Sequence, residues 1–192
     1  MSVPERVGRV ATYLWFLAAT VALVIWIRDP SVFTQESMAE WMLGWGEWAF
    51  WGFVVVALGR GLFLVPSTPV VLAGGVLFPD IPLAVFVFSM AGIVLSATVI
   101  YLLPGMGGYD ALLERKYPDK IARLKVHLVK PHAFWVVAGW SFFPFVPTDV
   151  ICYVAGLVRM SYRRMILAMI LGEVPLVLGY LLLTQRVHGL LE

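Results

Sequence analysis

The chain has 192 residues, of which 61% are hydrophobic and only 14% are charged, and its formal net charge at pH 7 is +2. Soluble domains average about 45–50% apolar and about 25% charged residues, and a domain of this size leaves roughly a third of its unfolded surface exposed. The composition therefore excludes a soluble domain, a disordered chain and a secreted disulfide scaffold, and it predicts an integral membrane protein.

Signatures of soluble enzymes and metalloproteins are absent from the sequence. The single cysteine, Cys152, excludes an internal disulfide and a cysteine-based metal site. The histidines lack ligand spacings such as HExxH, and no glycine-rich phosphate loop occurs. We therefore expect no metal, no cofactor and no enzymatic activity, and the small net charge gives no reason to expect a nucleic-acid partner.

The first apolar run, residues 10–27, is flanked by Arg9 and Arg28. It is close to the shortest stretch that spans about 30 Å of hydrocarbon, and no small-residue cleavage site follows it, as a signal peptide would require. We expect a permanent transmembrane helix here, followed by a polar, acidic outer segment. Residues 1–44 then form an N-terminal part that precedes the main membrane domain.

Two of the later apolar stretches each contain a pair of prolines. They are residues 48–82, with Pro66 and Pro69, and residues 133–158, with Pro144 and Pro147. A proline removes a backbone donor and clashes with the preceding turn, and irregular backbone is tolerated at membrane depth only inside protein or a water-filled cavity. Two such breaks favour two re-entrant helical hairpins, with kinked spanning helices as the alternative.

An apolar span follows each broken stretch. The span at residues 83–103 is uninterrupted, and the span at residues 165–184 contains Glu173 and Pro175. The positive-inside rule places the N-terminus, the basic connector 104–132 and the arginines at 159, 163 and 164 in the cytoplasm, and it leaves Arg28 and Arg186 outside. The first hairpin then enters and leaves on the outer side, and the second on the inner side. A helical stretch in the connector, residues 109–128, either lies on anionic headgroups or is a solvated linker.

The two halves share a spacing of proline, glycine and tyrosine. Pro66 is followed by Gly75, Gly92 and Tyr101, and Pro147 is followed by Gly156, Gly172 and Tyr180. We count Gly75 and Gly156 with the four prolines as the residues that break the hairpins. The pattern is that of an inverted-topology repeat, whose site lies near the midplane where broken helices meet, although coincidence would also explain it because glycine and proline are common here.

Ionisable side chains at membrane depth cost at least about 2.5–3.5 kcal/mol each, so those in the apolar stretches are candidate functional residues. Asp149 follows the Pro147–Thr148 turn. It is a candidate for binding a proton or a headgroup amine, or else it is the N-cap of the next helix. Glu173 has a similar role or pairs with Arg163 or Arg164.

Arg60 precedes the first hairpin break. It is a candidate ligand of a lipid phosphate or a partner of Glu47 or Asp149, unless its side chain extends to the interface. Glu47 lies among tryptophans that are typical of the interface, which favours an interfacial position. Hairpin hydroxyl groups complete the candidate path, and they belong to Ser67, Thr68, Ser141 and Thr148.

Two segments resemble a known family. WSFFPFVPTDVICYVAGLVRMSYRRMILAMILGEVP, residues 140–175, resembles the second half of the VTT (SNARE-associated, DedA-like) domain, and RGLFLVPSTPVVLAGGVLFP, residues 60–79, resembles its opening motif. The resemblance covers residues 45–184 and leaves 185–192 as a tail. It implies an all-α polytopic membrane protein with two opposed re-entrant hairpins, in which bacterial relatives move undecaprenyl phosphate or phosphatidylethanolamine and eukaryotic relatives scramble phospholipids. We accordingly expect a prokaryotic cell membrane.

The chain departs from the DedA-type pattern at three places. Ser67-Thr68-Pro69 stands where an acidic residue usually follows the first-hairpin proline, and Ser141 and Pro147 stand where the second hairpin usually carries arginines. The repeat overlay matches Arg60 with Ser141, so the cationic group could come from the other hairpin. These departures weigh against DedA-style proton coupling.

We therefore predict a membrane protein that moves phospholipid or polyprenyl-phosphate lipid between leaflets. Membrane lipids are the expected partners, and self-association into a homo-oligomer is left open. The alternative is a proton-coupled transporter of a small solute or ion, with Asp149 and Glu173 as carriers, and a non-transporting assembly factor is a third interpretation. An intramembrane enzyme is disfavoured because the spans contain no nucleophile–base pair.

Overall fold

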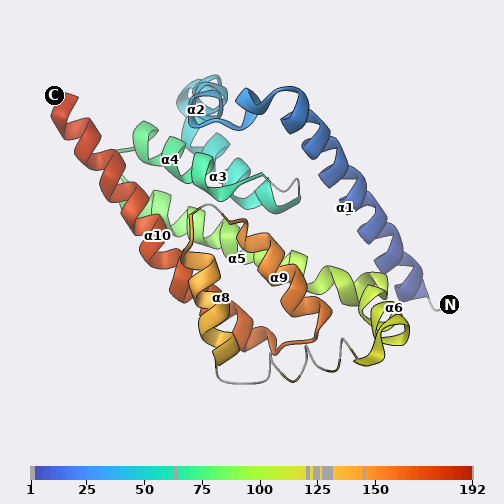
Figure 1. The fold of residues 1–192 in the computed structure, drawn as a ribbon. Coiled ribbons are helices and arrows are strands. Elements are labelled where there is room, and N and C mark those ends of the chain that lie inside the picture. Colours follow the sequence, from blue (N-terminus) through green and yellow to red (C-terminus); the bar gives the residue numbers. More distant parts are fainter. Residues whose placement is uncertain are drawn as a thin grey trace. The chain divides into compact units, whose positions relative to one another are not determined.

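The computed structural model describes residues 3–62, 65–119, 122, 126, 132–144 and 146–191. All regular secondary structure in these ranges is helical (Figure 1), as the composition predicts. The chain divides into two compact units. Unit 1 comprises residues 1–17 and 97–173, and unit 2 comprises residues 18–96 and 174–192.

Two long apolar helices run through the fold, α5 (Pro82–Gly107) and α10 (Tyr162–Leu191). With 26 and 30 residues, they extend about 39 and 45 Å, which exceeds the thickness of the hydrocarbon core. Both are long and apolar enough to cross a membrane, so the spans predicted at 83–103 and 165–184 are confirmed as helices. Pro175 lies inside α10 without ending it, as membrane helices allow.

The N-terminal part begins with α1 (Val3–Arg28), which contains the predicted helix at 10–27. At 26 residues, α1 extends about 39 Å, which is long enough to cross the hydrocarbon core. That it crosses the membrane stays a prediction. The outer segment after it forms three short helices, η1 (Pro30–Phe33), α2 (Gln35–Leu43) and η2 (Gly46–Trp48).

The first proline-containing stretch forms α3 (Ala49–Gly59), a short turn η3 (Arg60–Leu62) and α4 (Ser67–Leu77). Each of the two α-helices has 11 residues and extends about 16 Å, roughly half the hydrocarbon thickness. Pro66 is the N-cap residue of α4. Pro69 lies in the first turn of α4, where its missing N–H costs no hydrogen bond, so the chain is broken before Pro69 and not at it.

Aromatic rings form part of the core of unit 2. The ring of Phe50 on α3 meets the rings of Phe78 and Phe88 edge-on, with centroids 5.3 and 5.7 Å apart. Phe53 of α3 is fully buried and contacts Phe78. These contacts hold the α3–α4 pair on the start of α5, because edge-on aromatic pairs add attraction beyond the area they bury.

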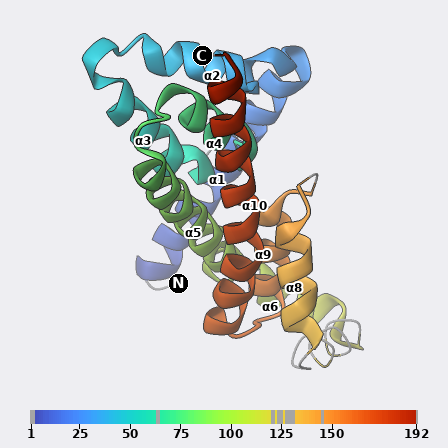
Figure 2. The same cartoon turned by 90° about the vertical axis from the view of Figure 1, so that its left-hand side faces the viewer.

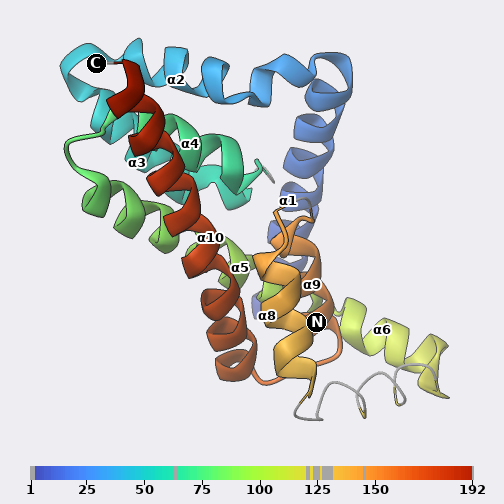
Figure 3. The same cartoon turned by 60° about the vertical axis from the view of Figure 1, so that its left-hand side comes forward.

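The second proline-containing stretch forms α8 (His132–Phe142) and α9 (Thr148–Leu157), which lie side by side in Figures 1 and 3. Pro147 is the N-cap residue of α9. The connector contributes α6 (Tyr109–Lys116), which is the start of the helical stretch predicted at 109–128. The part of that prediction from residue 120 onward lies outside the described residues, apart from single positions.

Gly75 and Gly156 do not break the hairpins, and that prediction is wrong. They lie inside α4 and α9 and are buried. A Cβ on Gly75 would lie 2.5 Å from Oγ1 of Thr184 and 3.0 Å from Cδ2 of Leu181, both on α10. A Cβ on Gly156 would lie 2.0 Å from the carbonyl oxygen of Tyr101 on α5. Both glycines therefore let a short helix approach a long one closely; Figure 2 shows α4 beside the C-terminal part of α10.

A second pair of glycines brings the long helices against α3 and α8. A Cβ on Gly92 of α5 would lie 1.9 Å from the carbonyl oxygen of Ala57 on α3. A Cβ on Gly172 of α10 would lie 2.3 Å from the carbonyl oxygen of Ala138 on α8. Backbone-to-backbone approach through small residues is the usual way that helices associate in membranes.

Candidate functional site

Arg60 is held at the break between α3 and α4. It is the C-cap residue of α3, and only 5% of its surface is exposed. Its Nη1 donates a hydrogen bond of 3.2 Å to the carbonyl oxygen of Val65, on the other side of the break. The structure therefore buries Arg60 inside unit 2.

A narrow gap beside Arg60 is lined by polar residues of three elements, Arg60 of η3, Ser67 of α4 and Ser89 of α5. It is lined by Ala57, Arg60, Ser67, Val70, Val71, Ser89 and Ile93. Ser89 is buried, and its Oγ has no hydrogen-bond partner among the described residues. Sequence reasoning missed Ser89. Its signal was the spacing of Ser89, Ile93 and Ser96, which share one face of a helix.

Thr68 connects the α3–α4 pair to a long helix. Its Oγ1 donates a hydrogen bond of 3.4 Å to the hydroxyl of Tyr180 on α10. Thr68 and Ser67 are both half-buried in the first turn of α4. Of the predicted path residues, unit 2 thus brings together Arg60 and Ser67 at one gap, while Thr68 points to α10.

Glu173 is the corresponding buried ionisable group of unit 1. Only 2% of its surface is exposed, and Oγ1 of Thr148 donates a 2.5 Å hydrogen bond to its Oε1. Thr148 is the first residue of α9, so the break at Pro147 aims its hydroxyl at α10. Arg164 lies about 14 Å from Glu173 along the axis of α10, which is farther than the i, i+4 spacing of intrahelical ion pairs.

Ser141 lies on α8 next to this group. It is fully buried, and its Oγ has no hydrogen-bond partner among the described residues. A Cβ on Gly172 would lie 2.8 Å from Cβ of Ser141, so the serine packs against the residue that precedes Glu173. The turn between α8 and α9 is closed by the indole of Trp140, whose Nε1 donates a 3.2 Å hydrogen bond to the carbonyl of Pro147.

The two remaining acidic candidates lie in different surroundings. Asp149 is half-buried in the first turn of α9, where a carboxylate interacts favourably with the helix dipole. The alternative that Asp149 is the N-cap is wrong, because Pro147 occupies that position. Glu47 is exposed in η2, in agreement with an interfacial position.

The two groups of side chains differ in charge. Unit 2 holds a buried guanidinium, and unit 1 holds a buried carboxyl group that accepts from a threonine. Within the part of the chain that the structure describes, no cluster of three or more histidine, cysteine, aspartate or glutamate side chains could hold a metal ion. Each group thus brings an ionisable side chain and a hydroxyl group together inside the protein.

Comparison with protein families matches residues 65–186 to the VTT domain. No curated protein and no solved structure matches the chain. The match extends from the end of the first break through α10, and it leaves out α3 and Arg60. Together with the two long apolar helices, it identifies an integral membrane protein. The chain belongs to the VTT-domain family.

Proposed function

We propose that this protein lets lipid headgroups cross from one leaflet to the other, in a prokaryotic cell membrane and with its N-terminus in the cytoplasm. The observation that carries the proposal is the burial of two ionisable side chains, Arg60 at 5% and Glu173 at 2% exposure. Arg60 lies at the break between α3 and α4 and shares a gap with Ser67 of α4. Glu173 lies within α10 and accepts a hydrogen bond from the hydroxyl of Thr148, the first residue of α9 after the break at Pro147.

Buried ionisable groups in a membrane protein need a functional reason. Each costs at least about 2.5–3.5 kcal/mol at the bilayer centre and typically lines a path for a polar or charged species. A lipid headgroup is such a species, and its acyl chains remain in the surrounding lipid while the headgroup passes. The proposed movement forms no covalent bond and needs no cofactor.

The helix pairs support re-entrant hairpins within an internal repeat. Helices of about 16 Å are too short to cross the hydrocarbon core. Gly92 meets the carbonyl of Ala57, and Gly172 meets that of Ala138, at positions that correspond in the sequence overlay. The glycines of α4 and α9 likewise each meet a long helix. Repeats of this kind build their sites where broken helices meet.

The test is a lipid-translocation assay in liposomes that carry a fluorescent phospholipid in both leaflets. Dithionite quenches only the outer leaflet, so quenching well beyond half shows translocation. We expect the native protein to translocate lipid, and Glu173→Gln and Arg60→Gln to lower the rate by about tenfold or more, the effect of losing about 1.4 kcal/mol. Glu47→Gln and Arg186→Gln, which change exposed charges, are the matched controls. Quenching that stops at half with the native protein contradicts the proposal.

A proton-coupled transporter of a small solute or ion is the second candidate. It is favoured by the buried carboxyl group of Glu173, which the hydroxyl of Thr148 contacts directly, because buried carboxyl groups often form proton relays in transporters. The same liposomes distinguish the two functions. Solute flux that follows an imposed pH gradient, without lipid translocation, supports the transporter and contradicts lipid passage.

A further inference from the structure

A buried serine of unit 1 has a hydroxyl group that the packing of the helices does not explain. Ser141 of α8 is fully buried, and its Oγ has no hydrogen-bond partner among the described residues. Such hydroxyl groups are rare in proteins, and a bound ion or water molecule beside them is a usual reason for them. Ser141 packs against Gly172, where a Cβ would lie 2.8 Å from the Cβ of the serine. The hydroxyl group therefore belongs to the surroundings of the next residue, Glu173.

Two more side chains contribute oxygen atoms to this buried region. The carboxyl group of Glu173 is on a residue that is only 2% exposed, and it accepts a hydrogen bond of 2.5 Å from Oγ1 of Thr148. A carboxylate has about four lone-pair sites and a hydroxyl group has two, so this bond uses only part of their capacity as acceptors. Three helices of unit 1, α8, α9 and α10, thus each supply a side-chain oxygen.

The break between α8 and α9 places two helix ends beside these oxygens. α8 ends at Phe142, next to Ser141, and α9 begins at Thr148. The carbonyl end of a helix is partly negative and favours a cation, whereas the N–H end is partly positive and favours a carboxylate. Broken helices in transporters use their ends in this way, with carbonyl ends on Na⁺ and N–H ends on anionic groups.

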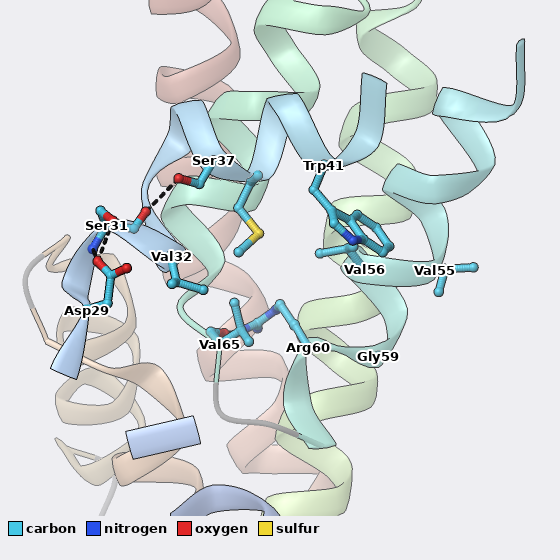
Figure 4. A pocket seen from close by; sticks show the side chains of 11 residues that line it. Asp29, Ser31, Val32, Ser37, Trp41, Val55, Val56, Gly59, Arg60 and Val65 are labelled. Carbon is cyan, nitrogen blue, oxygen red and sulfur yellow. Dashed lines mark hydrogen bonds between the residues drawn. The ribbon is translucent and has the colours of Figure 1, made fainter. Parts of the chain in front are cut away.

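The buried charge of unit 2 has the opposite sign and disfavours a cation there. A cavity of about 630 Å³ lies between the outer segment from Asp29 to Trp41 and the residues from Val55 to Val65 (Figure 4). Arg60 is the buried charged residue of its lining, and like charges repel strongly where water is excluded. Of the two buried ionisable groups, Glu173 is therefore the one that suits a cation.

The charge balance favours a monovalent cation over a divalent one. One carboxylate compensates one positive charge, and an uncompensated charge away from water is costly. Among the residues that the structure describes, no three histidine, cysteine, aspartate or glutamate side chains gather as they do in many sites for divalent ions. Sequence motifs for metals consist largely of such residues, so they give no signal for a site of one carboxylate and two hydroxyl groups.

We propose that Glu173, Thr148 and Ser141 bind a sodium ion, whose charge the Glu173 carboxylate balances and to which the two hydroxyl oxygens are ligands. The ion would give the Ser141 hydroxyl a partner and compensate the buried carboxylate. A sodium ion at Glu173 deepens the proposed function by naming a ligand of that site, and its link to lipid passage rests on that function.

Binding is measured by thermal melts of the full-length protein in a neutral detergent. The protein is purified in choline chloride, and sodium chloride then replaces choline chloride at constant total salt. An ion that binds only the folded protein stabilises it in proportion to the logarithm of its concentration above the dissociation constant. We expect each tenfold rise in sodium in that range to raise the melting temperature by about 3–5 °C. Equal melting temperatures in sodium and choline chloride, as expected if the group holds only a water molecule or a proton, overturn the proposal.

Two variants assign the response to this site. Ser141→Ala removes one oxygen ligand, and Glu173→Gln removes the charge at nearly constant volume. We expect Ser141→Ala to need about tenfold more sodium or more for the same rise, the effect of losing one contact to a charged species, and Glu173→Gln to show no rise. Ser89→Ala is the matched control, because Ser89 is also a buried serine whose Oγ has no hydrogen-bond partner in the described part of the chain, and it lies in unit 2. It should respond as the native protein does.

A native sodium response in Ser141→Ala overturns the proposal even if Glu173→Gln fails to fold, and an equal loss of response in Ser89→Ala does so too. The failure of this inference and that of the proposed function are distinguishable in the liposome assay. Translocation by a native protein that shows no sodium response removes the ion site and keeps the function. A sodium response without translocation keeps the ion site and contradicts the function.

Discussion

Replacement of Gly92 or Gly172 by alanine should destabilise the protein, although alanine is the better helix former. In each case the added methyl group would meet a backbone carbonyl of a neighbouring helix, at 1.9 Å for Gly92 and 2.3 Å for Gly172. Ordinary contact begins at 3.4 Å. The helices would therefore have to separate by about 1.5 Å and about 1.1 Å, since a carbonyl cannot rotate away as a flexible side chain can.

The magnitude follows from two opposing contributions. Overpacking costs about 1–3 kcal/mol, and the change from glycine to alanine in a helix interior returns about 0.8–1.0 kcal/mol. The net loss is up to about 2 kcal/mol and lowers the melting temperature by up to about 8 °C for a chain of this length. The loss should be larger for Gly92 than for Gly172, because its closest contact is the shorter one.

The assay is the fraction of protein that elutes as a single species from size-exclusion chromatography after heating in detergent. Gly179→Ala and Gly139→Ala are matched controls, because a Cβ at either helical position meets no atom within 4 Å. They should melt at the native temperature or slightly above it. If Gly92→Ala melts as high as Gly179→Ala, the close approach of α5 and α3 is refuted.

Three further predictions concern the other contacts. Thr148→Val should lower the melting temperature, and its combination with Glu173→Gln should add little to the larger single effect, because the two residues share one interaction; thermal melts of the four proteins test this. Thr68→Val and Tyr180→Phe should each cost about 0.5–1.5 kcal/mol, the value of one net hydrogen bond, and unequal losses in the same melts would contradict a shared bond. Cys152 is fully buried, so maleimide should label it only after denaturation, and rapid labelling of the folded protein would contradict its position.

Much of the fold was predictable because membrane insertion leaves strong signals in sequence. The two long apolar spans correspond to α5 and α10, and the proline breaks correspond to the gaps within the two helix pairs. The roles of Gly75, Gly156 and Pro69 were not predictable from local propensity. Glycine and proline weaken helices in general, whereas here tertiary packing at the glycines and the first-turn position of Pro69 keep them inside helices.

The candidate site was predictable as a set of residues but not as an arrangement. Arg60 and Glu173 stand out because they are charged within apolar stretches. The hydrogen bond from Thr148 to Glu173 joins residues of two different helices, and the cavity over Arg60 needs the outer segment from Asp29 to Trp41. The periodicity of the sequence predicts neither this hydrogen bond nor this cavity, because each depends on how helices that are separate in the sequence pack together.

The division of α5 and α10 between the two units has a consequence for biosynthesis. Gly75 of α4 meets Leu181 and Thr184, which belong to α10, and α10 is synthesised after every other helix of the two units. Until then the glycine face of α4 lacks its native neighbour, and α8 also awaits Gly172 on that same helix. Neither unit can be completed before α10 is synthesised, so a nascent chain that stalls before α10 should be a substrate for membrane chaperones and quality-control proteases.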